Sequence, residues 1–214
     1  MFPSESAIET AKRRQMVELQ LRQRSICDQK LLDIMEQLPR HHFIPQPNQS
    51  DAYLDQPVPI GFGQTISQPY IVGLMTEKLN VEPDHEVLEI GTGCGYQTAI
   101  LAKLCRWVYS IEIVEQLAQL GRENVTALDI TNVQYHIGDA WQGWPEQKQF
   151  DRIMVAAAAE EVPPVLLEQL KDYGKMVIPV GEQFGQKLLL LEKHGQKISK
   201  QNLCYCRFVR LVRK

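Results

Sequence analysis

Three alternating glycines and a carboxylate further along the chain are the residues best suited to chemistry in this 214-residue sequence. Gly91, Gly93 and Gly95 follow a short, largely apolar run at 86–90, and Glu112 ends a second apolar run twenty-one residues after Gly91. Glycine lets a ligand approach the backbone where a Cβ would clash, and a helix that opens after the turn offers unpaired N–H groups. A carboxylate placed like Glu112 can accept hydrogen bonds from both ribose hydroxyls. This spacing predicts a nucleotide pocket, although a lone glycine triplet also suits a tight turn.

The spacing of the glycines also indicates which kind of nucleotide binds. Dinucleotide-binding turns follow the pattern G-x-G-x-x-G, in which the third glycine allows close helix packing while the pyrophosphate rests on the helix N-terminus. Here Tyr96 occupies the place of that third glycine, so a nucleoside without phosphates fits better. The run from Glu89 to Gly95, E-x-G-x-G-x-G, resembles the first motif of Rossmann-like methyltransferases, and this resemblance implies S-adenosylmethionine.

The elements that hold these residues alternate between strand and helix through the second half of the chain. Apolar runs bounded by turn residues predict strands, and runs with helical spacing predict the helices between them. Such alternation is typical of an α/β fold with a doubly wound, mostly parallel sheet, here expected to be Rossmann-like. Two final strands at 187–192 and 203–209 have no helix between them and should form an antiparallel hairpin on one edge. The other expected strands are 86–90, 107–111, 133–137, 152–155 and 175–180, and the expected helices are 97–104, 115–128 and 164–173.

Two helices and a long irregular segment precede the first of these strands. Residues 6–24 lack glycine and proline and predict one helix, and Asp28 is a plausible N-cap for a second helix that Pro39 ends. Residues 43–69 contain five prolines and show no convincing period, yet they are rich in apolar and aromatic side chains. Long irregular segments in compact domains are usually functional or disordered, and this composition favours an ordered loop over a site. Pro69 suits the first turn of the next helix.

In a parallel sheet, ligands bind beyond the carboxyl ends of the strands, where neighbouring connections diverge. Gly138 and Asp139 follow the third expected strand, and the run 156–160 follows the fourth. Asp139 is suited to accept a hydrogen bond from an exocyclic amine such as that of adenine, and its alternative role is a turn former or helix cap. Apolar cover for the adenine could come from Tyr135, Ile137 or Trp141, and the sequence does not choose among them.

Composition bounds the broad class of protein. With 44% hydrophobic and 23% charged residues, one globular domain is expected, with N-terminal helices and a substrate loop at 1–82 and a cofactor-binding sheet at 83–214. A net charge of −3 gives no bulk attraction to nucleic acid or anionic lipid. The N-terminus lacks the apolar core of a signal peptide, and no run approaches the roughly 18 apolar residues of a membrane span. We therefore expect a cytoplasmic protein that binds neither nucleic acid nor membrane.

Cysteine and histidine spacing argues against disulfides and metal. The five cysteines form no C-x-x-C pair, so reduced thiols are expected. Cys204 and Cys206 alternate along a strand and should share one face. The five histidines have no ligand spacing, and His41 and His42 are expected to cap or solvate the end of a helix. No metal site is predicted.

Several further segments complete the pattern around the glycine turn. Residues 52–72 contain the narrow run Gly-Gln-Thr-Ile-Ser-Gln-Pro, and the other segments are 89–98, 110–112, 138–139 and 207–209. Together they resemble the protein-L-isoaspartate O-methyltransferases of bacterial type, from the second helix to near the C-terminus. The resemblance implies methyl transfer from S-adenosylmethionine to the α-carboxylate of L-isoaspartyl residues in damaged proteins. It also implies that the ester then closes to a succinimide, part of which opens to normal aspartate.

The same resemblance implies roles for individual residues. The family's catalytic serine matches Ser67, which would hold the acceptor carboxylate by a hydrogen bond and would not be a covalent nucleophile. Ser67 also lies where an N-cap for the helix at Pro69 would be, and one hydroxyl could serve both roles. The residues expected to bind substrate are Ile60, Thr65, Ser67, Arg207, Phe208 and Val209. The residues expected to bind cofactor are Ile66, Gly91, Thr92, Gly93, Gly95, Tyr96, Glu112, Gly138 and Asp139.

The chain departs from the family pattern at two places, and other functions stay open as alternatives. Alanines at 156–159 stand where the family often begins with a polar residue, and Arg210 stands where it tends to carry proline. The alternatives are a methyltransferase acting on a small molecule, a nicotinamide oxidoreductase, a base-modifying methyltransferase and a nucleoside binder without turnover. The oxidoreductase would need the missing third glycine, and the base-modifying enzyme would need an Asp/Asn-Pro-Pro-aromatic run in place of the alanines. We expect isoaspartyl proteins and peptides as partners of a monomeric enzyme.

Overall fold

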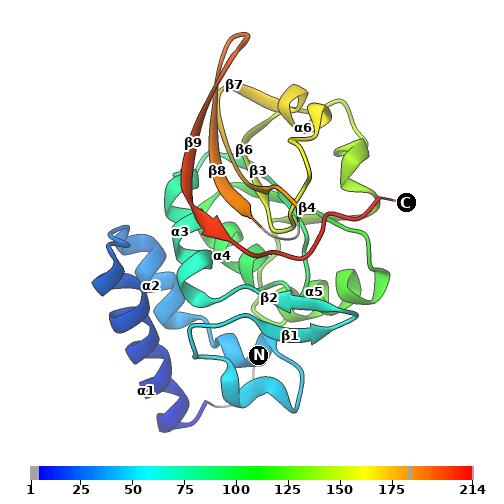
Figure 1. Cartoon of the computed structure of the whole chain (residues 1–214). Coiled ribbons are helices and arrows are strands. Elements are labelled where there is room, and N and C mark those ends of the chain that lie inside the picture. The colour runs from blue at the N-terminus through cyan, green and yellow to red at the C-terminus, as the bar shows by residue number, and fades with distance from the viewer. Residues whose placement is uncertain (1–4, 183–184, 214) are drawn as a thin grey trace.

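The computed structural model describes residues 5–182 and 185–213, and a seven-stranded sheet organises this part of the chain (Figure 1). The strand order is β5-β4-β3-β6-β7-β8-β9. The first five strands in this order are parallel, β8 is antiparallel to β7, and β9 is antiparallel to β8 at the edge. The predicted α/β fold with a final antiparallel hairpin is thereby confirmed. The strands are β3 (Glu86–Ile90), β4 (Trp107–Glu112), β5 (Val133–Ile137), β6 (Phe150–Val155), β7 (Leu170–Val180), β8 (Gln186–His194) and β9 (Lys197–Cys206).

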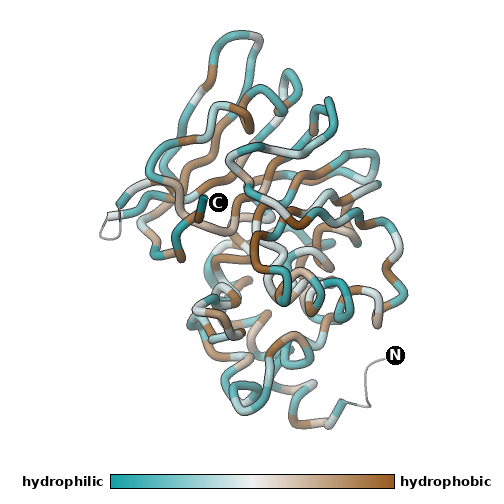
Figure 2. Tube along the Cα trace, turned by 90° about the vertical axis from the view of Figure 1, so that its right-hand side faces the viewer, coloured by the Kyte–Doolittle hydropathy of each residue, from teal (hydrophilic) through white to brown (hydrophobic). Residues whose placement is uncertain are grey.

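Alternate residues of the inner strands enter two hydrophobic cores on opposite faces of the sheet. Val87 and Val108 are paired in register and belong to the first core, whereas their neighbours Leu88 and Tyr109 belong to the second. Because both faces are covered, the inner strands are largely apolar (Figure 2). The first core includes residues of α1 (Ala7–Met16), α2 (Gln29–Gln37), α3 (Pro69–Leu79), α4 (Tyr96–Leu104) and α5 (Glu115–Thr126), and the second includes α6 (Pro164–Glu168).

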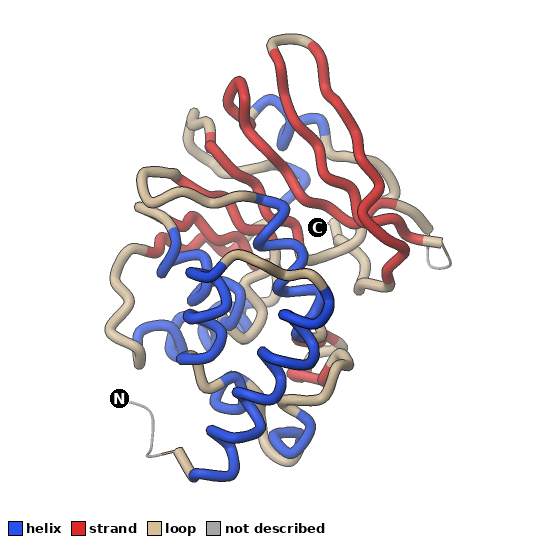
Figure 3. The backbone as a smooth tube through the Cα atoms, turned by 90° about the vertical axis from the view of Figure 1, so that its left-hand side faces the viewer, coloured by secondary structure: helices blue, strands red, loops and turns tan. Residues whose placement is uncertain are grey.

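The N-terminal helices lie together on one side of the strands (Figure 3). Helix α1 begins with a capping box, in which Ser6 Oγ accepts from Glu9 N–H at 3.2 Å and Glu9 Oε2 accepts from Ser6 N–H at 3.1 Å. The helical path continues through a π turn (Val17–Leu21) and a 3-10 turn (Arg22–Arg24), which confirms the helix predicted for 6–24. The predicted Asp28 cap of α2 is also present.

The segment between α2 and α3 is ordered, as predicted, but the expectation that it lacks regular structure is wrong. It contains β1 (Val58–Gly61) and β2 (Gln64–Ile66), which form an antiparallel hairpin. The turn between them passes through Phe62, which has a φ of 54° between two glycines with positive φ. Strands of four and three residues are too short to show a period, and proline within one of them obscures it further. Two 3-10 helices, η3 (Arg40–Phe43) and η4 (Asn48–Asp51), precede the hairpin.

Two predicted elements differ in extent from the structure. The helix expected at 164–173 ends at Glu168, because Leu170 begins β7, pairs with Phe150 and is buried in the second core. The strand expected at 203–209 is shifted, since β9 ends at Cys206 and the chain then leaves the sheet. None of the helices in residues 5–182 and 185–213 combines the length and hydropathy of a membrane span.

Candidate active site

A cavity of about 300 Å³ lies at the carboxyl ends of the parallel strands, where ligand binding is predicted. Gly91, Thr92 and Gly93 line it after β3, Glu112 lines it as the last residue of β4, and Gly138 lines it after β5. From β3 the chain continues to β4 on one side, while β6 pairs with β3 on the other, so the cavity lies at the point where connections diverge. Other wall residues include Ile60, Thr65, Ile66, Ser67, Met75, Tyr96, Val114, Leu117, Ala156 and Val209.

The three glycines of the turn have different structural roles. Gly91 and Gly93 line the cavity with φ angles of 94° and 53°, and a Cβ on Gly93 would lie 3.3 Å from Ile60 Cδ1. Gly95 is outside the cavity wall, and a Cβ there would lie 2.6 Å from the carbonyl oxygen of Gly121. Gly95 therefore lets α4 begin against α5. This is the packing role that dinucleotide turns give to a glycine one residue later.

Gly121 of α5 supports the turn and was not identified from the sequence. A Cβ on Gly121 would lie 2.8 Å from both Gly93 O and Thr92 Cγ2, so glycine is needed for α5 to approach the turn this closely. A glycine in a helix interior costs about 1 kcal/mol relative to alanine. A glycine within the helix predicted at 115–128 was therefore the one sign in the sequence that another segment packs closely against it.

Glu112 holds the turn as well as lining the cavity. Its Oε2 accepts a hydrogen bond from Gly93 N–H at 2.9 Å, and its Oε1 accepts from Ile113 N–H at 2.9 Å and Val114 N–H at 3.0 Å. A carboxylate offers about four acceptor sites, so these bonds leave about one for a ligand. Glu112 is only 7% exposed and lines the cavity, so these bonds hold its carboxylate at the cavity wall.

A buried carboxyl group lies behind the turn. Glu89 Oε2 accepts hydrogen bonds from Thr98 Oγ1 and Ser110 Oγ, each at 2.6 Å. Ser110 Oγ is also 2.6 Å from Thr92 Oγ1, which connects the carboxyl group to the cavity wall. Burial raises the pKa of Glu89 to about 7, against the opposing effect of the Ser110 and Thr98 hydroxyls. The network therefore fixes Thr92 through a group whose charge changes near neutral pH.

A second cavity, of about 340 Å³, shares part of its wall with the first. Ser67 belongs to both walls and is partly buried. The N-cap of α3 is Gln68, and no side chain caps that helix, so the alternative role of Ser67 as a cap is wrong. Within the described residues the Ser67 hydroxyl has no protein hydrogen bond, and it can therefore bind a ligand. The other residues common to both cavities are Thr65, Ala156 and Val209.

Asp139 lies next to the cavity wall without belonging to it. Its Oδ1 accepts from Trp141 N–H at 2.9 Å and caps a 3-10 helix, η5 (Ala140–Gln142), so its alternative capping role is present and a contact with adenine stays a prediction. The three candidates for adenine cover do not line the cavity, whereas Ile113, Val114 and Ala140 do. The described ranges hold no cluster of three or more His, Cys, Asp or Glu residues suited to a metal ion.

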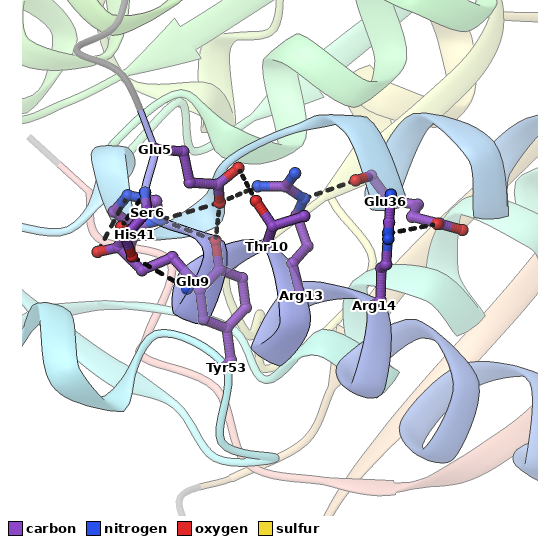
Figure 4. Close-up of polar contacts among 9 residues, drawn as sticks. All are labelled: Glu5, Ser6, Glu9, Thr10, Arg13, Arg14, Glu36, His41 and Tyr53. Atoms are coloured by element: carbon purple, nitrogen blue, oxygen red, sulfur yellow. Dashed lines mark hydrogen bonds and ion pairs between the residues drawn. The ribbon is translucent and has the colours of Figure 1, made fainter.

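A polar cluster holds the start of the segment that carries Ser67 (Figure 4). Tyr53 Oη lies 2.7 Å from His41 Nδ1, and Glu5 accepts hydrogen bonds from Arg13, Thr10 and Tyr53. Burial lowers the pKa of His41 and raises the pKa of Tyr53. His41 is 4% exposed, so the expected solvation at a helix end is wrong for this residue.

Residues 207–213, here called the C-terminal strap, pass from β9 across both cavities. The strap is held to the chain after β6, because Val209 O accepts from Ala158 N–H and Leu211 N–H donates to Ala158 O, both at 2.8 Å. All six residues expected to bind substrate lie in the walls of the two cavities, and three of them belong to this strap. The strap contributes Arg207 and Phe208 to the second cavity, Arg210, Leu211 and Val212 to the first, and Val209 to both.

Comparison with known proteins points to one family. Residues 11–214 match the family model described as protein-L-isoaspartate(D-aspartate) O-methyltransferase (PCMT). The protein-L-isoaspartate O-methyltransferase of Opitutus terrae is 48% identical over 206 residues, which cover 96% of this chain and 88% of that protein. The enzyme of the same name from Picosynechococcus sp. is 46% identical over 201 residues, which cover 94% and 90%.

Solved structures have the same overall fold. A Plasmodium falciparum protein described as a protein-L-isoaspartate O-methyltransferase, crystallised with S-adenosyl-L-homocysteine, superposes with a TM-score of 0.82 at 29% identity. The superposition covers 94% of this chain and 99% of that chain. A second structure with the same enzyme name also gives a TM-score of 0.82, at 26% identity, and covers 92% of this chain and 65% of its own.

Proposed function

The chain belongs to the protein-L-isoaspartate(D-aspartate) O-methyltransferase family, and from this premise we propose how its two cavities divide the reaction. The enzyme transfers a methyl group from S-adenosylmethionine to isoaspartyl residues of damaged proteins, which starts their repair. The first cavity holds the cofactor, and the second receives the isoaspartyl segment. The observation that supports this division is that Ser67 lines both cavities where they meet.

The residues around the first cavity fit an adenosyl ligand. Gly91 and Gly93 leave the backbone bare of Cβ atoms there, and Glu112 offers a fixed oxygen to a ribose hydroxyl. Ile113 and Val114 offer an apolar surface to the adenine. The bound cofactor supplies an electrophilic methyl group on a sulfonium sulfur. The contacts are assigned to Ile66, Gly91, Thr92, Gly93, Tyr96, Glu112, Gly138 and Asp139, with Gly95 shaping the turn.

Ser67 orients the acceptor group in the second cavity. The α-carboxylate of an isoaspartyl residue has a reference pKa of about 4 and is ionised at neutral pH, so its attack on the methyl group needs no general base. The Ser67 hydroxyl donates a hydrogen bond to one carboxylate oxygen and leaves the other to attack. The neighbouring walls exclude water from the carboxylate. Such positioning and desolvation can lower the barrier by several kcal/mol.

The steps after methyl transfer need no group from the enzyme. In the released ester, the main-chain nitrogen of the following residue attacks the ester carbonyl, loses its proton and displaces methanol, which closes a succinimide. Water then opens that ring at either carbonyl. Opening at one of the two regenerates normal aspartate, and opening at the other returns isoaspartate for another round.

The enzyme is further proposed to act as a monomer in the cytoplasm and to bind neither nucleic acid nor membrane. All five cysteines are free thiols, which suits a reducing compartment. The net charge of −3 gives no general attraction to polyanions. Sedimentation equilibrium should give a single species of 24.5 kDa, and a species of twice that mass would contradict the monomer.

A pair of peptides that differ only at one linkage tests the proposed reaction. With S-adenosylmethionine carrying a labelled methyl group, an isoaspartyl peptide should gain label and its normal aspartyl twin should not. Equal labelling of both peptides, or labelling of neither, would contradict the assignment. Calorimetric titration with S-adenosylmethionine and with NAD tests the oxidoreductase alternative, because only that alternative predicts binding of NAD.

A further inference from the structure

A buried cation lies beneath the segment that carries Ser67. Arg40 begins η3 directly after Pro39 and is 0% exposed. Within the described ranges its guanidinium has no salt bridge with a carboxylate, and its Nη1 has no hydrogen-bond partner. Burial lowers the pKa of Arg40, as expected for a charge removed from water without a counterion. Removal of this charge from water costs free energy, which the contacts of the guanidinium must offset.

The guanidinium joins the two ends of the loop that contains the β1–β2 hairpin. Arg40 Nε donates to Ala52 O at 2.7 Å, and Arg40 Nη2 donates to Ser67 O at 2.7 Å. Ala52 precedes the hairpin and Ser67 directly follows it, so one planar group sets the distance between the two ends. The planar fork of arginine holds two carbonyls from separate nitrogens at fixed directions, whereas a lysine ammonium would have to bind both from one nitrogen at the end of a flexible stem.

The same group contacts the wall of the first cavity. Arg40 Cζ lies 5.0 Å from the ring centroid of Tyr96, in cation–π geometry. Tyr96 opens α4 directly after the glycine turn and lines the first cavity. Arg40 therefore connects the backbone of Ser67 with the element that begins at the glycine turn, and the spacing between these two parts depends on it.

We propose that Arg40 is a positioning residue for methyl transfer, which acts by fixing the Ser67 backbone relative to the first cavity. This inference rests on the proposed role of Ser67. Arg40 lines neither cavity, so it contacts neither reactant and acts through the position of Ser67. A buried and partly unpaired cation at this place is consistent with a loss of stability that is tolerated for function.

The variants Arg40→Lys, Ser67→Ala and their double mutant test this inference. Arg40→Lys keeps the charge but loses the fork, and it should fold and bind S-adenosylmethionine like the wild type. Its kcat/KM for an isoaspartyl peptide should fall by about tenfold to a hundredfold, since a misplacement of about 1 Å can cost a hundredfold in rate. Amide exchange across 58–66 should become faster. The double mutant should be no slower than Ser67→Ala.

Arg152→Lys is the matched control. Arg152 is also buried and donates to two carbonyls, Asn80 O at 3.0 Å and Asp151 O at 2.8 Å, and it lines neither cavity. Its substitution should leave kcat/KM and amide exchange across 58–66 unchanged in the folded protein.

Three other outcomes would contradict the inference about Arg40, and they differ in whether the role of Ser67 survives. Unchanged kcat/KM in Arg40→Lys, or a double mutant slowed by the full product of both single effects, would overturn this inference and leave the Ser67 assignment intact. A rate loss in Arg40→Lys that matches a loss of folded protein or of cofactor affinity would overturn it as well. A Ser67→Ala variant with normal turnover would remove both the Ser67 assignment and the inference built on it.

Discussion

The Glu112 carboxylate is largely occupied by the protein before any ligand binds. Three backbone N–H groups donate to it, so its charge organises the glycine turn and leaves about one acceptor site for a ribose hydroxyl. The spacing between Gly91 and Glu112 was enough to predict that Glu112 lies at the nucleotide pocket. The expectation of contacts to both ribose hydroxyls came from motif patterns, and the backbone donors that compete for the same oxygens are visible only in three dimensions.

Substitution of Glu112 should weaken cofactor binding in two ways, because the glycine turn loses its acceptor and the ribose loses its hydrogen-bond partner. Glu112→Ala and Glu112→Gln should each raise the Kd for S-adenosylhomocysteine by about ten- to a hundredfold, because hydrogen bonds to a charged group contribute about 1.5–3 kcal/mol. The glutamine variant should bind S-adenosylhomocysteine little better than the alanine variant. Its NH₂ group is a hydrogen-bond donor, so it cannot accept from the backbone N–H groups that the carboxylate binds. Calorimetric titration measures both, with Glu115→Gln on the first turn of α5 as control. Wild-type affinity in Glu112→Gln would contradict this account.

Glu89 predicts a specific dependence of stability on pH. Its pKa is raised to about 7 in the folded protein from 4.5, so between these values the folded state binds the extra proton. The contribution of Glu89 to stability therefore falls as pH rises from about 4.5 to 7 and is constant above that range. Glu89→Gln does not titrate, so its stability relative to the wild type should increase over this range, by roughly 3 kcal/mol at most. Urea unfolding at pH 5 and pH 8 measures this, and an equal difference at both pH values would contradict it.

At the level of elements, the contact between α5 and the glycine turn decides the shape of the first cavity. Gly121→Ala would place a Cβ 2.8 Å from Gly93 O, so the helix or the turn must move. We expect a loss of about 1–3 kcal/mol in the free energy of unfolding and about tenfold weaker binding of S-adenosylhomocysteine. Thermal unfolding and calorimetric titration measure the two effects.

Gly73→Ala in α3 is the control for this prediction. Its Cβ would lie 2.9 Å from Leu21 Cδ2, the end of a flexible side chain away from the cavities. This variant should change stability without changing cofactor affinity. Equal affinity for cofactor in both glycine variants would show that α5 does not control the turn.

Element positions were predictable where hydrophobic pattern and local signals agreed. Asp28, Pro69 and the glycine turn mark their helices correctly, and β3 and β5 have the expected bounds. The errors arose where tertiary pairing decided the outcome. Leu170 has helical neighbours in sequence but pairs with Phe150, and the β1–β2 hairpin depends on a turn with three positive φ angles that composition does not reveal.

The candidate site was predictable in its residues but not in their arrangement. Motif resemblance selected Ser67, Thr65 and Val209, and the structure shows that all three lie in the wall shared by two cavities. Arg40 and Gly121 had no functional motif of their own. Their importance comes from contacts between segments far apart in sequence, which no local pattern records.

At the scale of the whole molecule, we infer that 1–82 and 83–214 form one folding unit. The first core combines Leu31 of α2 and Val72 of α3 with Val87 and Val108 of the sheet, so neither part has a complete core alone. Calorimetric unfolding should therefore show a single transition. Two separated transitions would indicate two independent units.

The C-terminal strap should be required for function and dispensable for the fold. Removal of residues 208–214 deletes the Val209 and Leu211 bonds to Ala158 and one side of both cavities. The shortened chain should keep its circular dichroism spectrum, while cofactor binding and methyl transfer are lost. Removal of residues 213–214 alone keeps the cavity walls and is the control. Normal activity after the longer deletion would contradict this role.

The edge of the sheet formed by β9 has a consequence for an enzyme whose clients are damaged proteins. Damaged chains present loosened segments that can add as an extra strand to any open edge, which leads to co-aggregation. Strand β9 forms that edge here, and its solvent-exposed side chains include Lys197, Lys200, Gln201 and Asn202. The lysine charges along this border disfavour strand addition, so a repair enzyme can approach unravelling proteins repeatedly without being trapped by them.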